Sequence, residues 1–187
     1  MVWRCLGEAW SWLEAQIFLV PEPGANGNNG FRFLSRRAEL IEREQDFYQY
    51  IIACKLPKEI LHDRIRQRIW SCFVRGEYDS AVFQAMKAVE VYVREAAGFD
   101  RAQRGADMMR RVFNEDNGPL TNFSLETAEK QSVAHLFAGS YGYFRNPNAH
   151  HDVPLDSPEE ALEIVLLANH LLRIVDVSVK RNAEEGD

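Results

Sequence analysis

Apolar residues recur every three or four positions over most of the chain, which is the spacing that gathers them on one face of an α-helix. Four such segments follow one another, with apolar stripes over residues 60–73, 81–93, 133–144 and 161–175. Gly76 and Gly98 follow the first two stripes, at the position where glycine commonly ends a helix. Ser157, Pro158 and Glu160 open the fourth as a cap, a first-turn proline and a glutamate three positions after the cap. The pattern predicts a mainly α protein.

The third and fourth segments differ from an ordinary amphipathic helix. Gly139 and Gly142 inside the third segment each cost roughly 1 kcal/mol of helix stability relative to alanine, so we expect another helix to approach them closely. The fourth segment is apolar on most sides, which predicts burial nearly all round, in a central position or at a dimer contact. Residues 98–122 are irregular apart from a short helix expected over 107–113.

The first 36 residues follow a different order. Residues 3–16 have helical spacing, residues 17–20 and 31–34 predict strands, and the Gly, Asn and Pro between the strands predict a loop. This order resembles the second half of a winged helix-turn-helix without its earlier helices. A structural or partner role therefore competes with DNA contact through Arg32 and Arg36, and the tryptophans of this part are expected to pack in a core.

These patterns divide the chain into four parts. They are a helix with a β-hairpin (1–36), a linking helix (37–56), a helical domain (57–181) and a loose polar tail (182–187).

Composition narrows the class of protein without naming a function. The chain has 187 residues, 46% of them hydrophobic and 27% charged, as in an ordinary globular protein. Its net charge of −6 opposes nucleic-acid binding in general, although arginines cluster over 32–43, 64–68 and 101–111. Scattered cysteines and histidines predict no disulfide, no metal site and no cofactor. Neither a secretory signal nor a membrane span is recognised, which favours a bacterial cytoplasm.

Candidate chemistry gathers where the third helical segment ends. Pro147 has no N–H and excludes its predecessor from the α region, so the helix should end near Arg145 or Asn146. Arg145 and His150 then lie on opposite arms of a bend and can converge on one small volume. A guanidinium binds two phosphate oxygens, and an imidazole takes or gives a proton near neutral pH. The pair favours metal-free attack of a ribose 2′-OH on the adjacent phosphate, with Asn146 donating a further hydrogen bond.

An ordinary structural explanation of the same residues stays open. An arginine in the last turn is favourable against the helix dipole, and Asn146-Pro147-Asn148 is common turn chemistry. His150 can simply bond a backbone carbonyl. Spacing alone does not separate the two interpretations.

The segment Arg145-Asn146-Pro147-Asn148-Ala149-His150 resembles the R-x4-6-H motif of HEPN domains, in which a polar residue directly follows the arginine. The wider chain is similar to the Ymh-type bacterial proteins with this domain, over about residues 57–180. The matching pieces are residues 76–81, 85–90, 136–139 and 145–150. The resemblance implies a HEPN-like four-helix bundle, a homodimer and, in catalytically active members, metal-independent RNA cleavage. Some HEPN proteins are not nucleases.

Four further residues are candidates for contact with RNA. In the family fold the second helix borders the turn, so Lys87 or Glu90 can orient Arg145 or touch substrate; the two can equally form a surface ion pair. Tyr143 can stack on a base or pack against neighbouring rings, and His151 can assist His150 or occupy the outer face of the turn. The expected catalytic set is Arg145, His150 and Asn146.

Three functions follow from these features. The first is a metal-independent endoribonuclease of toxin or phage-defence type, with RNA, a second copy of the chain and a neutralising antitoxin or other defence protein as partners. The second is a non-catalytic HEPN-like module that binds RNA, a nucleotide or a protein, and the acidic net charge favours it. The third is a transcriptional regulator built on the hairpin, and the incomplete winged element counts against it.

Overall fold

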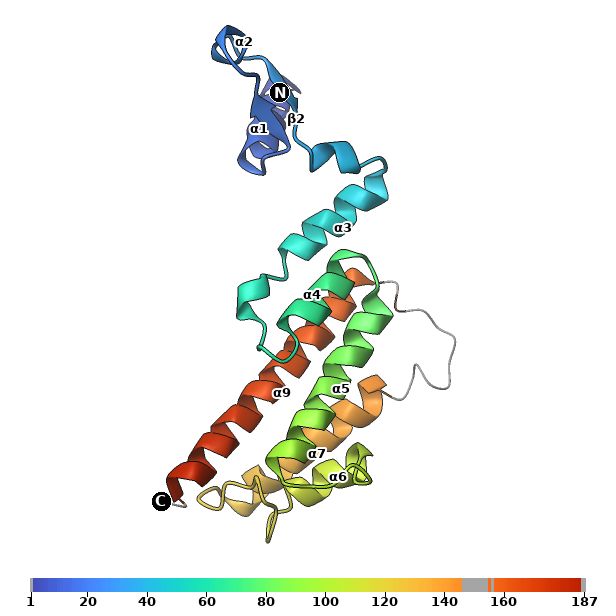
Figure 1. The fold of residues 1–187 in the computed structure, drawn as a ribbon, viewed down its shortest axis with the longest axis vertical. Helices are drawn as coiled ribbons and strands as arrows, with labels where there is room; N and C mark the ends of the chain where they lie inside the picture. The colour runs from blue at the N-terminus through green and yellow to red at the C-terminus, as the bar shows by residue number, and fades with distance from the viewer. Residues whose placement is uncertain (1, 146–154, 156, 186–187) are drawn as a thin grey trace. The chain divides into compact units, whose positions relative to one another are not determined.

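The computed structural model describes residues 2–145, 155 and 157–185. Helices make up most of this described chain, together with a two-stranded sheet, so the mainly α prediction is confirmed (Figure 1). The chain divides into two compact units, residues 1–50 and 51–187.

The N-terminal unit is a helix followed by a β-hairpin. Helix α1 (Val2–Ala15) leads to β1 (Leu19–Pro21), which pairs antiparallel with β2 (Arg32–Leu34). The connection contains α2 (Ala25–Asn28) where the sequence predicted only a loop, because a four-residue helix is too short to show helical periodicity. A 3-10 turn, η1 (Ala38–Leu40), follows the hairpin.

Phe18 forms the centre of this unit. Its side chain is 3% exposed, and its ring centroid lies 4.9 Å from that of Tyr50 and 5.6 Å from that of Phe47. The prediction that the tryptophans pack in a core is wrong for Trp3, which is 86% exposed. No residue of α1 is buried, because so small a unit cannot cover the outer face of its helix.

The C-terminal unit is organised around α5 (Tyr78–Ala96). This helix contacts α4 (Arg66–Val74), α6 (Gly105–Val112), α7 (Thr127–Arg145) and α9 (Pro158–Glu185). Helices α5 and α9 lie side by side over most of their length (Figure 1). Small side chains let the two helices approach closely, since Ala81 and Ala85 on α5 and Ala161 and Ala168 on α9 are completely buried.

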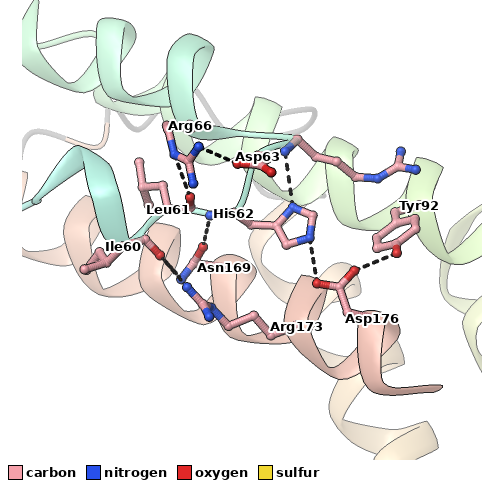
Figure 2. A network of polar contacts seen from close by, with 10 residues as sticks. Ile60, Leu61, His62, Asp63, Arg66, Tyr92, Asn169, Arg173 and Asp176 are labelled. Atoms are coloured by element: carbon pink, nitrogen blue, oxygen red, sulfur yellow. Dashed lines mark hydrogen bonds and ion pairs between the residues drawn. The ribbon is translucent and has the colours of Figure 1, made fainter. Parts of the chain in front are cut away.

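The first helix of this unit begins later than the sequence predicted. The apolar stripe over residues 60–73 predicted one continuous helix, whereas the structure has η2 (Lys58–Ile60), an irregular link and then α4. Figure 2 shows how side chains of α9 replace the helical hydrogen bonds of this link. Asn169 Oδ1 accepts from the His62 N–H at 2.6 Å, and Asn169 Nδ2 donates to the Ile60 carbonyl at 3.2 Å. Arg173 donates to the same carbonyl at 2.8 Å.

The linking helix is also shorter than predicted. Residues 37–55 divide into η1 and α3 (Glu44–Cys54) instead of forming one helix. Asp46 Oδ2 accepts from the Arg43 N–H at 3.1 Å. This contact caps α3 from within its first turn and so fixes where the helix begins.

Helix α9 begins as predicted and ends later. The capping prediction is confirmed, since Ser157 Oγ accepts from the Glu160 N–H at 3.2 Å. Residues 182–185, predicted to be a loose tail, continue the helix, and Asn182 donates to the Pro119 carbonyl at 2.6 Å. The helix faces the core along its length but is not buried all round, because Val177 is 66% exposed.

We expect Asn169→Ala to lower the free energy of unfolding by about 1–3 kcal/mol, because the His62 N–H would lose its acceptor in a partly buried place. Urea unfolding followed by circular dichroism measures this change. Asn117→Ala is the matched control, since Asn117 is exposed in a loop, and its effect should stay within about 0.5 kcal/mol. Equal effects of the two substitutions would show that Asn169 does not hold the link.

A candidate functional site at the end of α7

Arg145 is the last residue of α7 and is half-buried. Its guanidinium carbon lies 5.5 Å from the ring centroid of Phe83 on α5 and 5.9 Å from that of Tyr141, one turn earlier on α7. Its Nε is buried, and no atom of the described residues accepts a hydrogen bond from it. A buried donor without a partner is costly, and an anion at this point would satisfy it.

Tyr141 lies one helical turn before Arg145 on α7 and next to the buried carboxylate of Glu90. Tyr141 is 4% exposed, and Glu90 on α5 is 7% exposed. Burial raises the pKa of Tyr141 to about 12; the Glu90 carboxylate adds to this rise, and the positive charge of Arg145 opposes it. The Tyr141 hydroxyl therefore stays protonated at neutral pH and sits between a negative and a positive group.

Glu90 also fixes the start of α6. Its Oε1 accepts a hydrogen bond from the Gly105 N–H at 2.7 Å, at the first residue of that helix. A carboxylate is favourable there because the N-terminal end of a helix carries partial positive charge. Glu90 thus connects α5 and α6 and borders the Tyr141–Arg145 pair on α7. We call the three residues Glu90, Tyr141 and Arg145 the arginine cluster.

The structure separates Lys87 from Glu90. Lys87 is exposed whereas Glu90 is buried, and no ion pair between them is present in the described chain. Of the two, only Glu90 belongs to the arginine cluster. Lys87 lies one helical turn after Phe83, whose ring contacts the Arg145 guanidinium.

The remaining predicted site residues fall into two groups. Tyr143 is 72% exposed, and its ring makes an edge contact with Phe144 at 4.9 Å, so it is not part of the arginine cluster. Asn146, His150 and His151 lie outside the described residues.

Sequence reasoning placed neither Tyr141 beside Arg145 nor Asp79 beside Leu155. Asp79 Oδ1 accepts from the Leu155 N–H at 3.0 Å, and no side-chain cap bond is found at the start of α5 among the described residues. Asp79 and Phe83 are four residues apart on α5. The residues flanking 146–154 are therefore held by neighbouring turns of one helix, Arg145 beside Phe83 and Leu155 at Asp79. The sequence alone could not show this arrangement, because Asp79 and Leu155 are 76 positions apart.

A second polar cluster, drawn in Figure 2, joins the irregular link before α4 to α5 and α9. His62 Nε2 lies 3.0 Å from Asp176 Oδ2, and the Tyr92 hydroxyl donates to Asp176 Oδ1 at 2.6 Å. His62 Nδ1 accepts from the Arg64 N–H at 3.2 Å, so Nε2 carries the proton and donates to Asp176. Both ring nitrogens are thus committed to structural bonds. This histidine lies in the irregular link, not within a helix as the sequence predicted.

The described residues contain no group of three His, Cys, Asp or Glu side chains arranged to hold a metal ion. None of the helices that the structure describes is both long and apolar enough to cross a membrane.

The fold and the cluster together define a mainly helical protein with a cationic site at the C-terminal end of a core helix. Residues 59–175 match the family Hypoth_Ymh, whose description is a protein of unknown function, and the chain belongs to this family. The Ymh-type resemblance is thereby confirmed, whereas membership of the HEPN superfamily stays a prediction. No curated protein and no solved structure matches the chain.

The pKa of Tyr141 gives a pH prediction. An unfolded tyrosine ionises near pH 10, whereas the folded value is about 12. A raised folded pKa contributes stability that is complete below the unfolded value and is lost as pH rises through the folded one. The difference in unfolding free energy between the wild type and Tyr141→Phe should therefore be constant below pH about 10 and shrink towards about 12.

Spectrophotometric titration of tyrosinate checks the same assignment. Tyr141 should ionise at a pH of about 12, and Glu90→Gln should lower the pKa of Tyr141 only in part, because burial is the larger cause of the rise. Ionisation of Tyr141 near the ordinary tyrosine value of about 10 would contradict its burial in the arginine cluster.

Proposed function

We propose that this protein is a metal-independent RNA endonuclease of the HEPN type. Arg145 stabilises the charge that develops on the phosphoryl oxygens, and His150 transfers the proton. The single observation that carries the proposal is the Arg145 guanidinium, which stands at the end of α7 with a buried Nε that is unpaired among the described residues.

The proposed reaction needs charge stabilisation and proton transfer. The ribose 2′-OH loses its proton to the imidazole and attacks the adjacent phosphorus. The bond to the 5′-oxygen of the next nucleotide breaks, and this oxygen takes the proton back from the imidazolium. The products are a 2′,3′-cyclic phosphate and a 5′-OH end. Arg145 presents a planar fork of donors to the phosphoryl oxygens, and Asn146 adds a further donor.

Support for the role of Arg145 comes from what holds it. The rings of Phe83 and Tyr141 lie close to the guanidinium, and the buried Glu90 carboxylate interacts with the Tyr141 hydroxyl. A side chain fixed in this way pays little further entropy when it binds a phosphate. The same arrangement favours arginine over lysine, because a flexible ammonium cannot stack on the rings or bind two oxygens at once.

A homodimer is part of the proposal. Nothing in the described chain lies within 4 Å of the position where a side chain at Gly139 or Gly142 would begin, so the described residues do not supply the expected neighbouring helix. On the same helix Leu136 and Tyr143 are exposed. We propose that a second copy packs against this face of α7 and brings the two Arg145 sites together.

A second candidate function is a non-catalytic HEPN-like module that binds RNA, a nucleotide or a protein such as an antitoxin. The net charge of −6 favours it, because efficient processing of a polyanion normally calls for a basic surface. In this case Arg145 would bind an anion without turnover, and Arg145→Ala would weaken affinity.

Purified protein should cut single-stranded RNA in the presence of EDTA and leave 2′,3′-cyclic phosphate ends. Arg145→Ala and His150→Ala should each lower the rate by roughly 10²–10⁴-fold, and Arg145→Lys should restore little of it. Arg110→Ala is the matched control, since Arg110 is exposed on α6 and already paired with Asp107. Cutting that survives loss of both Arg145 and His150 rejects the proposal, whereas binding without cutting selects the second function.

Gly139→Leu should shift the protein from dimer to monomer, because the added side chain would block the close approach of a second α7. Sedimentation velocity over a range of concentrations measures the change. Gly7→Leu is the control, since Gly7 is also a helical glycine with open space around it but lies on α1. A wild type that stays monomeric at every concentration, or a Gly139→Leu variant that still dimerises, would reject an interface on this face.

A further inference from the structure

A groove of about 240 Å³ lies between α4 and α5. Three cationic side chains of the described residues line it: Arg64 from the turn before α4, Arg68 from α4 and Lys87 from α5. Its apolar lining includes Ile65 and Ile69, and none of the described residues that line it is acidic. In a chain with a net charge of −6, such a concentration of positive charge in one groove calls for an explanation.

Two of the three cations are not neutralised within the described chain. No ion pair of the described residues engages Arg68 or Lys87, and both side chains are exposed. Arg64 is paired with Glu95 at 2.8 Å, and its guanidinium carbon lies 3.8 Å from the ring centroid of Tyr92. Arg64 is therefore held in place by its partners, whereas the positive charges of Arg68 and Lys87 have no carboxylate partner among the described residues.

Lys87 connects this groove to the arginine cluster. Phe83 and Lys87 are four residues apart on α5, so their side chains are neighbours on one face of the helix. Phe83 is the residue whose ring contacts the Arg145 guanidinium. Positive groups thus follow one another from Arg145 across α5 to Arg68 on α4.

We propose that the groove between α4 and α5 binds the phosphodiester backbone of the RNA strand that flanks the cleaved linkage. This inference rests on the proposed function and adds the path of the substrate. The walls of the groove are α-helices whose backbone N–H and C=O groups are paired internally, so they offer no partners to the backbone of a peptide. A row of cations over an apolar floor instead suits phosphates spaced along a single strand.

The test is the salt dependence of RNA binding. The probe is a fluorescent single-stranded RNA with 2′-O-methyl groups on every ribose, which binds but cannot be cut by 2′-OH attack. Each phosphate contact to a single strand contributes about 0.7 to the slope of log affinity against log salt. The double variant Arg68→Gln/Lys87→Gln should therefore reduce the slope by about 1.4.

The matched control is Arg110→Gln/Lys180→Gln, which removes the same charge from two exposed residues that already have carboxylate partners, Asp107 and Glu184. Its slope should equal that of the wild type. An equal reduction in both double variants would mean that overall charge alone matters, and it overturns the groove. Absence of RNA binding by the wild type overturns it as well.

A second probe separates RNA from a protein occupant. Labelled polyglutamate should bind the Arg68→Gln/Lys87→Gln variant at least as tightly as it binds the Arg110→Gln/Lys180→Gln control variant. If polyglutamate loses affinity in this variant while RNA does not, the occupant is an acidic protein segment and the proposal is overturned. Failure of the nuclease proposal would be seen separately, as absence of cutting of unmodified RNA by a wild type that still binds the methylated strand through the groove.

Discussion

The close packing of α5 against α4, α6, α7 and α9 is the interaction on which the C-terminal unit depends. Alanines at the contact with α9 remove side-chain bulk, and larger residues such as Met86 and Val89 fill the remaining space on α5. A helix surrounded in this way leaves little room for water. A charged group on its buried face is therefore costly unless it has a protein partner, and such a partner can fix a surrounding element.

Glu90 illustrates this requirement. Its carboxylate lies in the core, accepts from the first amide of α6 and borders the Tyr141 hydroxyl, which in turn lies beside Arg145. A group that is costly to bury thus serves both to position α6 and to support a cation at the end of α7. Asn169 plays the corresponding structural role on α9, where it satisfies the backbone of the link before α4.

Helix α5 borders both the Arg145 end of α7 and the groove between α4 and α5. The proposed catalytic arginine and the proposed RNA-binding groove therefore lie against the same helix. Arg145 contacts Phe83, and Lys87 follows one turn later. An acidic protein can handle a polyanion if its few unpaired cations lie along one path. Within the hairpin unit, Arg32 is engaged with Glu14 of the same unit. That pairing makes Arg32 a poor candidate for contact with DNA.

The sequence by itself determined the long helices and the start of α9, because periodic apolar residues, glycines, Pro147 and the Ser157 cap act locally. It also singled out Arg145, since the proline places it in the last helical turn. Only the tertiary structure decided that the stripe after residue 57 does not continue as a helix, because Asn169 and Arg173 lie more than a hundred positions away. It likewise decided that Glu90 is buried and Lys87 exposed. Both lie on α5, and only the placement of α6 and α7 around that helix distinguishes them.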